Sequence, residues 1–327
     1  MKILITGATG FIGRHLANAL SKSEHSVRCL ARKTSNLDFL RNINVEIYDG
    51  DLLDRDSIGQ ALRKVDVIYH LAGQVHSWHK NDYYEGNIST TRNLLDCCRE
   101  QGLKKIIFLS SVGVYRPVAT KVLLTEDSDC EPITFYGRTK LDAEELIKKY
   151  NIPWVIVRAP VVYGPYQPPV LNRFFLDVFN RRKIYIVGSG DNLRSLCFID
   201  NLIEGLILLS SKQVGGRTYI LSDGKPYTLN EIIEVGSKVI HQRVEVVHLP
   251  IFLGNIAWKV YRLMDTIFGL CPEELYAIKK MQLNEGCDIT KAKKEVEYNP
   301  MITLEMGIER TINWIKENHI SGGDNGK

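Results

Sequence analysis

The sequence predicts an α/β fold in which a doubly wound parallel sheet carries helices on both faces and a smaller mixed α/β lobe follows. Three observations support this prediction. Short β-branched or apolar runs alternate with helix-like segments through the first half of the chain. Some of these runs are nearly continuous in apolar residues, such as Ile106, Ile107, Phe108 and Leu109, as is typical of buried parallel strands. The regular alternation then stops near residue 165.

The first half should contain six strands joined by five crossover helices. The expected strands are Lys2 to Thr6, Val27 to Ala31, Val45 to Tyr48, Val67 to Leu71, Ile106 to Ser110 and Val155 to Arg158. This order of elements is the Rossmann architecture. Beyond it, a helix from Asn201 to Ser211 and a strand from Arg217 to Leu221 are expected to fold back on the main sheet.

Composition and charge narrow the class of protein. The 42 basic and 38 acidic residues of the 327 are scattered, so the formal charge of +4 predicts no nucleic-acid partner. The seven cysteines are an odd number without Cys-x-x-Cys spacing, which favours a reducing compartment, the cytoplasm, over a disulfide framework. Three glycines within residues 7–13 end the N-terminal apolar run too early for a signal peptide. We expect no bound metal.

Residues 250–270 form a second apolar stretch. Lys259, Arg262 and Asp265 interrupt it too often for a membrane span. It either lines an apolar pocket or forms an amphipathic helix of the lobe. The amphipathic helix is favoured, because the large apolar residues recur near helical spacing: Trp258, Tyr261, Leu263 and Ile267.

A glycine-rich turn follows the first strand and leads directly into an amphipathic helix. Without a Cβ, glycines let backbone amides and a helix N-terminus approach a pyrophosphate. Such a turn can also be merely a tight connection, but its strand-turn-helix context is that of a dinucleotide site. We therefore predict cofactor contacts from Gly7, Thr9, Gly10, Phe11, Ile12 and Gly13.

The end of the second strand bears on the choice of dinucleotide. An acid there would accept hydrogen bonds from a free ribose diol and repel a 2′-phosphate. This sequence has Ala31 followed by Arg32 and Lys33, whose charges favour NADP over NAD. The alternative is a solvated basic turn.

Tyr136 and Lys140 share one face of an expected helix, since they are four residues apart. A neighbouring ammonium lowers the pKa of a phenol, and the charge of a nicotinamide would lower it further, so Tyr136 could act as base and acid near neutral pH. Tyr276 and Lys280 repeat the spacing. However, Tyr136 lies between the fifth and sixth strands, at the nicotinamide end of such a sheet. We predict that Tyr136 and Lys140 are catalytic and contact the cofactor.

The Gly-x-x-Gly-x-x-Gly spacing and this pair resemble the extended short-chain dehydrogenase/reductase family, of the NAD-dependent epimerase/dehydratase type, which includes sugar-nucleotide 4-epimerases and reductases. The resemblance runs from Met1 to about Trp314 and includes the stretch Asp288-Ile289-Thr290-Lys291-Ala292. It implies an NAD(P)-binding domain at 1–165 and a substrate-binding lobe at 166–320 that interleaves with the sheet. A disordered tail is expected at 321–327.

The resemblance also implies further site residues. Additional cofactor contacts are Asp51 and Leu52 after the third strand, Leu71, Ala72 and Gly73 after the fourth, Asn87, and Pro160 and Val161 after the sixth. Asn87 would help to position the lysine; the alternative is that it only caps a helix. Ser111 would be the catalytic hydroxyl that stabilises charge on the reacting oxygen. Substrate contacts would come from Ser111, Val112, Tyr136 and Arg194, the last through phosphate oxygens.

For function, the resemblance implies C4 epimerisation of a nucleotide sugar through a keto intermediate. The first alternative is a one-way NADP-dependent reductase or dehydrogenase of a keto sugar, sterol or flavonoid-like carbinol, favoured by Arg32 and the apolar stretch 250–270. The second is a non-enzymatic NADP sensor, against which the intact Ser111, Tyr136 and Lys140 argue. Relatives dimerise through the helices expected at 87–100 and 141–150, so a homodimer is expected.

Overall fold

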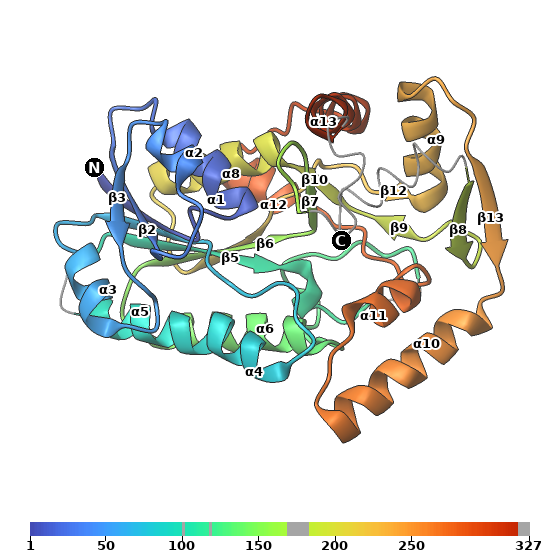
Figure 1. The fold of residues 1–327 in the computed structure, drawn as a ribbon, viewed down its shortest axis with the longest axis horizontal. Helices are drawn as coiled ribbons and strands as arrows, with labels where there is room; N and C mark the ends of the chain where they lie inside the picture. The colour runs from blue at the N-terminus through green and yellow to red at the C-terminus, as the bar shows by residue number, and fades with distance from the viewer. Residues whose placement is uncertain (100–101, 118–119, 169–182, 320–327) are drawn as a thin grey trace.

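The computed structural model describes residues 1–99, 102–117, 120–168 and 183–319. Its centre is a seven-stranded parallel sheet in the order β11-β6-β5-β4-β1-β2-β3 (Figure 1). The strands are β1 (Lys2–Thr6), β2 (Ser26–Ala31), β3 (Glu46–Asp49), β4 (Val67–His70), β5 (Lys105–Ser111), β6 (Trp154–Ala159) and β11 (Arg217–Ile220). The predicted doubly wound sheet is confirmed, including the strand that returns to it from the second half of the chain.

Helices cover both faces of this sheet (Figure 1). One layer contains α1 (Phe11–Leu20), α2 (Asp38–Arg41) and α8 (Ile199–Ser211). The other contains α3 (Arg55–Ala61), α4 (Lys80–Tyr84), the π-helical turn η1 (Glu85–Ser89), α5 (Thr90–Cys98) and α6 (Phe135–Lys149).

The strands are apolar throughout because their side chains enter two different cores. Ile107 belongs to the core under α1 and α8, whereas its neighbours Ile106 and Phe108 belong to the core under α3, α5 and α6. Successive residues of a strand point to opposite faces, so a sheet covered on both sides needs apolar residues at every position. Two arginines in these strands form ion pairs, Arg28 with Glu46 and Arg158 with Glu144.

The C-terminal lobe is mixed α/β, as expected. Three two-stranded sheets pair β10 (Leu196–Phe198) with β7 (Val161–Tyr163), β12 (Tyr227–Thr228) with β9 (Leu193–Arg194), and β13 (Glu245–Leu249) with β8 (Lys183–Val187). Its helices are α9 (Leu229–Val239), α10 (Phe252–Leu263) with the π-helical η3 (Met264–Phe268), α11 (Glu273–Lys280), α12 (Thr290–Val296) and α13 (Leu304–His319). The stretch 250–270 is thus helical, as its spacing favoured. The expected tail at 321–327 lies outside the described residues.

Within the described ranges, no helix has both the length and the apolar character that crossing a bilayer requires. The predicted division of the chain at residue 165 stays a prediction.

Candidate active site

The glycine-rich turn joins β1 to α1 and leaves no space for side chains at two of its glycines. Gly7 has φ of 72°, and a Cβ there would lie 2.7 Å from the backbone nitrogen of Ala72. A Cβ on Gly13 would collide with the carbonyl oxygen of Gly7. Gly10 precedes α1 without any side-chain cap, and the first helical turn carries no acidic residue. These amides and the positive end of the helix dipole suit a pyrophosphate.

The other predicted cofactor residues gather at the same edge of the sheet. Each follows the carboxyl end of a parallel strand, where open α/β sheets bind ligands, and β1 lies at the switch point between β2 and β4. Thr9, Phe11 and Ile12 follow β1, Asp51 and Leu52 follow β3, Leu71, Ala72 and Gly73 follow β4, and Pro160 and Val161 follow β6. The geometry therefore fits a dinucleotide, with its adenine end toward β3 and its nicotinamide end toward β6.

The basic turn after β2 is exposed. The Lys33 ammonium pairs with the Asp49 carboxylate at 3.1 Å, and Ala31 is the register partner of Asp49. Arg32 is also exposed. The second strand ends without an acidic residue, but the Asp49 carboxylate of the third strand lies next to that position. This carboxylate is paired with Lys33.

Asn87 connects the turn after β4 to α6. Its Oδ1 accepts the backbone N–H of Gln74 at 2.9 Å, and its Nδ2 donates to the Gln74 carbonyl and the Thr139 hydroxyl, both at 3.0 Å. Asn87 lies within η1 and caps no helix, so the capping alternative is wrong. Because Thr139 precedes Lys140, Asn87 is placed to position that lysine. A Cβ on Gly73 would lie 3.7 Å from the Lys140 ammonium.

Close packing at the start of α6 brings Tyr136 to Ser111. The Thr134 hydroxyl caps the helix by accepting the Gly137 N–H at 3.1 Å. Gly137 packs so tightly against the Gly113 carbonyl that a Cβ there would collide with it. A Cβ on Gly113 would lie 3.3 Å from the Ser111 hydroxyl and 3.9 Å from the Tyr136 ring. The predicted hydroxyl and phenol are therefore neighbours.

Lys140 is buried beneath this surface. Its ammonium donates to the Leu109 carbonyl at 2.6 Å and lies 4.2 Å from the centre of the Phe108 ring. Burial lowers the pKa of Lys140 to about 7, against the opposing charge of Glu144. A lysine that loses its proton near neutral pH can exchange protons with a neighbouring acid or base.

Burial, rather than the lysine, dominates the pKa of Tyr136. Desolvation raises this pKa to about 12, and a hydrogen bond with the Ser111 hydroxyl opposes the rise. The negative charge of Glu273 raises it further. Lys140 is not among the causes that shift this pKa, so the expected lowering by its ammonium is not seen in the protein chain.

Glu273, at the start of α11, is a residue of this site that the sequence did not reveal. Its carboxylate accepts the Tyr83 hydroxyl at 3.5 Å, and the Tyr83 and Tyr136 rings lie 6.1 Å apart. Burial raises the pKa of Glu273 to about 7, opposed by the charge of Lys280. No motif surrounds it, and only the fold of the lobe brings it near Tyr136.

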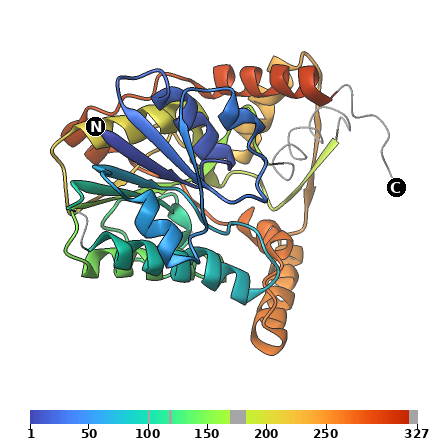
Figure 2. The same ribbon diagram turned by 60° about the vertical axis from the view of Figure 1, so that its left-hand side comes forward.

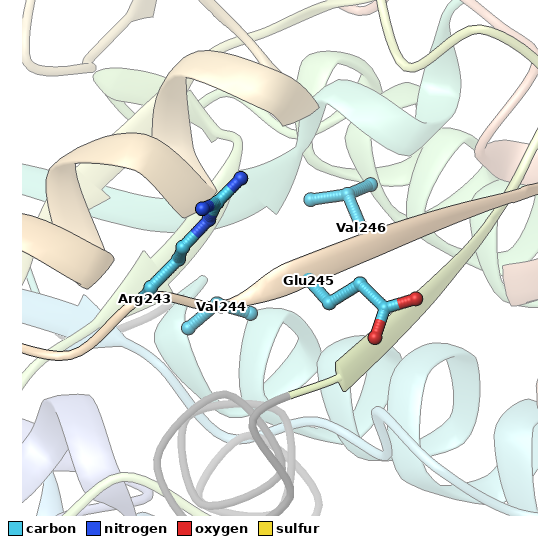
Figure 3. A pocket seen from close by; sticks show the side chains of 4 residues that line it. All are labelled: Arg243, Val244, Glu245 and Val246. Carbon is cyan, nitrogen blue, oxygen red and sulfur yellow. The ribbon is translucent and has the colours of Figure 1, made fainter.

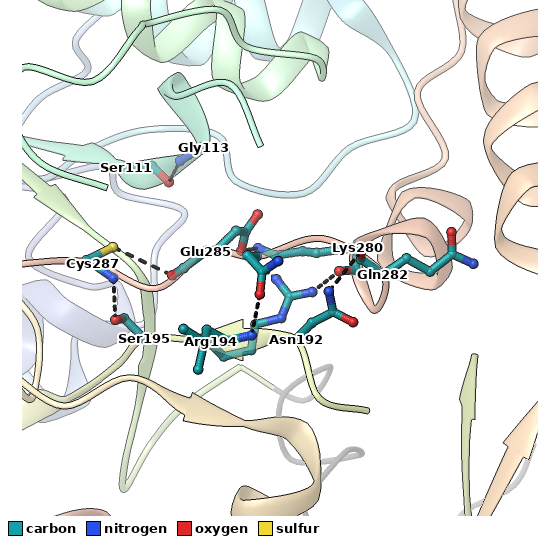
Figure 4. A network of polar contacts seen from close by, with 11 residues as sticks. Ser111, Gly113, Asn192, Arg194, Ser195, Lys280, Gln282, Glu285 and Cys287 are labelled. Carbon is teal, nitrogen blue, oxygen red and sulfur yellow. Dashed lines mark hydrogen bonds and ion pairs between the residues drawn. The ribbon is translucent and has the colours of Figure 1, made fainter. Parts of the chain in front are cut away.

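Arg194 lies in a polar network of the lobe (Figure 4). Its guanidinium forms an ion pair with Glu285 at 2.6 Å and donates to the Lys280 carbonyl. The Lys280 ammonium also pairs with Glu285, at 2.9 Å. Two cations share one carboxylate, so these three residues carry one net positive charge. The predicted contact of Arg194 with substrate phosphates stays a prediction.

Two other features lie apart from the reacting groups. The Val112 side chain is 6% exposed and packs in the main core, so its predicted substrate contact would have to come from the backbone. A surface hollow along β13 is lined by Arg243, Val244, Glu245 and Val246 (Figure 3). None of these four belongs to the predicted site.

A buried ion pair fixes α6 to the sheet one turn beyond Lys140. Glu144 accepts two hydrogen bonds from the Arg158 guanidinium, at 3.0 and 2.6 Å, and one from the Ser110 hydroxyl at 2.5 Å. Glu144 is fully buried and Arg158 is 3% exposed. Ser110 thus has a structural partner, whereas its neighbour Ser111 faces Tyr136.

Comparison with known proteins identifies relatives that include dinucleotide-dependent enzymes, in agreement with the dinucleotide-site geometry described above. The sequence model of the NAD dependent epimerase/dehydratase family matches residues 3–222. An uncharacterised UDP-glucose epimerase of Bacillus subtilis is 31% identical over 96% of this chain and 98% of its own length.

Two further similarities add detail. The N-acetyl-α-D-glucosaminyl-diphospho-ditrans,octacis-undecaprenol 4-epimerase of Escherichia coli O157:H7 is 26% identical over 95% of this chain and 94% of its own. The crystal structure of UDP-glucuronic acid 4-epimerase from Bacillus cereus, in complex with UDP-glucuronic acid and NAD, aligns with a TM-score of 0.78 at 28% identity. That alignment covers 97% of this chain and 99% of the other.

Proposed function

We propose that this chain, which belongs to the NAD dependent epimerase/dehydratase family, epimerises C4 of a diphosphate-linked sugar, most simply a nucleotide sugar. The observation that carries the proposal is that the Ser111 hydroxyl lies beside Tyr136 at the start of α6, after the end of β5. Lys140 is buried one helical turn further along α6, where its ammonium donates to the Leu109 carbonyl.

Tyr136 would remove one proton from the sugar's C4 hydroxyl and later return it. The Tyr136 phenolate takes the proton of the C4 hydroxyl, while the Ser111 hydroxyl donates a hydrogen bond to the same oxygen and stabilises its charge. A bound NAD(P) supplies the hydride acceptor and donor, and its positive charge helps to lower the pKa of the phenol. After the keto sugar has turned over, Tyr136 returns the proton to the oxygen. The net change is inversion at C4.

Tyr136 and Lys140 would act as one proton-exchanging unit. The pKa of Lys140 is about 7 and that of Tyr136 about 12, so the lysine is the member of the pair that loses a proton near neutrality. This supports proton transfer at physiological pH even though burial opposes a phenolate.

The residues beside the catalytic hydroxyl favour epimerisation over elimination of water. A 4,6-dehydratase needs an extra acid pair beside the catalytic hydroxyl, and this chain has Val112 and Gly113 there, neither of which can transfer a proton. The relatives named above act on, or bind, sugars joined to a diphosphate. The net positive charge shared by Arg194, Lys280 and Glu285 supports a diphosphate as the linking group.

For the cofactor, NAD(P) binding follows from the family, and NADP is the form we propose, on the electrostatics of Arg32. The solved relative contains NAD, so the preference needs its own test. Arg32→Asp should shift the ratio of NADP to NAD affinities toward NAD by ~1–3 kcal/mol, the scale of a charge-assisted hydrogen bond. Arg41→Asp, a change of an exposed arginine that pairs with Asp38, serves as the control. An unchanged ratio in Arg32→Asp would show that Arg32 faces solvent.

We also propose that the protein works as a cytoplasmic homodimer. All seven cysteines are free thiols, which supports a reducing compartment. The dimer would form through α5 and α6, the helices by which relatives associate. Sedimentation equilibrium of the purified protein tests the oligomeric state.

The function is tested with purified protein and UDP-glucose, followed by product analysis for UDP-galactose. The expected result is interconversion without net consumption of NAD(P). Consumption of NADPH with a ketone, and no interconversion, would instead indicate a one-way reductase. Bound cofactor with neither activity would indicate a sensor. A panel of UDP-glucuronic acid and UDP-N-acetylglucosamine distinguishes a narrow substrate preference from a lack of epimerase activity.

A further inference from the structure

The outward side of α10 and η3 is unusually apolar for an exposed helix. Seventeen residues, 252–268, form this continuous helical segment. Large apolar side chains are exposed by 40 to 66% along it: Phe252, Ile256, Val260, Leu263, Ile267 and Phe268, preceded by Ile251. Most recur at three- or four-residue spacing and so form one stripe, which we call the outer stripe. Isolated exposed apolar residues are ordinary, but a continuous stripe marks an interaction surface.

The charges beside the outer stripe have one sign. Lys259 and Arg262 are exposed on the same side of the helix. The only carboxylate within residues 251–270 is Asp265, which pairs with Lys80 at 2.8 Å. Apolar side chains flanked by free cations suit an anionic lipid surface, where the headgroups attract the cations and the apolar groups enter the headgroup boundary. Self-association through this stripe would instead bring two sets of cations together.

The inner side of the same helix reaches the candidate active site. Trp258 stacks on Tyr261 with ring centres 5.2 Å apart, and Tyr261 is buried. Both belong to a small apolar cluster that includes Tyr83 and Tyr136. In both views α10 projects at the rim of the molecule, away from the central sheet (Figures 1 and 2). One helix thus has an apolar, cationic side toward solvent and an aromatic side toward the reacting groups.

We propose that the outer stripe docks this protein reversibly on an anionic membrane surface, with α10 lying in the plane of the interface. The segment lies on the bilayer rather than across it, since three charged residues interrupt its seventeen positions. The proposal rests on the stripe and its cations, and is independent of the reaction that the site catalyses.

Co-sedimentation with unilamellar vesicles tests the proposal. Wild-type protein should bind vesicles of phosphatidylcholine and phosphatidylglycerol (3:1) and bind pure phosphatidylcholine much more weakly. The double variant Ile256→Asp/Leu263→Asp should weaken binding by roughly tenfold or more, since two apolar groups leave the interface. Lys259→Glu/Arg262→Glu should also weaken it by roughly tenfold or more, because each basic residue near such a surface contributes about 1 kcal/mol.

The matched control is Val122→Asp/Met301→Asp, which changes two side chains that are 66 and 65% exposed outside this helix. It should bind vesicles like the wild type, and thermal unfolding should show that all variants are folded. Absence of wild-type binding to anionic vesicles would overturn the proposal, as would normal binding of Ile256→Asp/Leu263→Asp. A stripe-dependent dimer in sedimentation, without vesicle binding, would overturn it in favour of a second copy of this chain. Loss of epimerase activity alone would not bear on it.

Discussion

In two helices of this protein, α6 and α11, a tyrosine is followed four residues later by a lysine. The burial and the partners of the two pairs differ. At the start of α6, Lys140 is buried and donates to a strand carbonyl, and Tyr136 neighbours Ser111. In α11, Lys280 is paired with Glu285 at 2.9 Å, and the Tyr276 ring packs 6.1 Å from Trp258. The comparison teaches that spacing brings two side chains to one face, whereas the element beneath them determines what they can do.

The pKa values express the same difference. Burial lowers the pKa of Lys140 to about 7, within reach of neutral pH. Burial and the charge of Glu285 raise the pKa of Tyr276 well above its ordinary value. A carboxylate already neutralises Lys280 and opposes ionisation of Tyr276. Both phenols are favoured in their neutral form, and the two pairs differ in the lysine, because burial lowers the pKa of Lys140 whereas Lys280 is paired with Glu285.

Substitution of the two tyrosines gives the largest expected difference. Tyr136→Phe should lower kcat by roughly 10²–10⁴-fold while cofactor affinity stays nearly unchanged, because only proton transfer is lost. Tyr276→Phe, the matched control, should change kcat by no more than a few-fold. Steady-state kinetics and cofactor titration measure both. Equal losses in the two variants, or an active Tyr136→Phe, would remove the distinction between the pairs.

The second expected difference concerns how firmly the helices are held. α6 buries Glu144 in an ion pair with Arg158, whereas α11 has no fully buried residue. Glu144→Ala leaves a buried guanidinium without its partner, so it should lower the free energy of unfolding by about 3–5 kcal/mol. Glu145→Ala, which changes the exposed partner of Lys148, should cost less than about 1 kcal/mol. Urea unfolding curves compare the two, and a small effect of Glu144→Ala would show that α6 is held by its apolar contacts.

The nucleotide-binding half could be predicted from the sequence because its signals are local. Each predicted strand lies within one residue of its position in the structure, since apolar runs for a doubly covered sheet are hard to mistake. Gly13 is required by the backbone of Gly7, six residues earlier, so the spacing of these two glycines is itself the signal. Tyr136 could be chosen over Tyr276 because it lies between two strands that the sequence also identifies.

The lobe's contribution to the site could not be predicted, since it depends on distant parts of the chain. Glu273 lies near Tyr136 only because α10 and α11 pack beside the start of α6. The resemblance implies that Arg194 donates to phosphate oxygens, but its partner Glu285 is 91 residues away and no local signal points to it. The sequence predicts that the neighbouring ammonium sets the pKa of Tyr136, but burial, which a sequence does not express, is the main cause, and Lys140 is not among the others.

The pH dependence of turnover gives the smallest and most discriminating difference between the two pairs. Each helix has one group near the site with a pKa of about 7. In α6 this group is Lys140, and in α11 it is Glu273, the first residue of the helix. If the Tyr136–Lys140 unit is the base, kcat rises as pH rises through a value at or below about 7, because the deprotonated form accepts the sugar's proton. Glu273→Gln then keeps the ascending limb. The limb stays near its wild-type pH, because Glu273 is not among the charges that shift the pKa of Lys140, the group of the pair that titrates near 7.

Glu274→Gln, a change of the exposed neighbour, is the control and should leave the profile in place. Loss of the limb in Glu273→Gln would assign the base to α11 and reverse the roles of the two helices. A limb that persists in Glu273→Gln and vanishes in Lys140→Arg would assign it to α6, because an arginine keeps its charge at every pH of the assay and cannot exchange the proton. The two substitutions together therefore identify the titrating group. The pKa values cannot do so, because Lys140 and Glu273 both have a pKa of about 7.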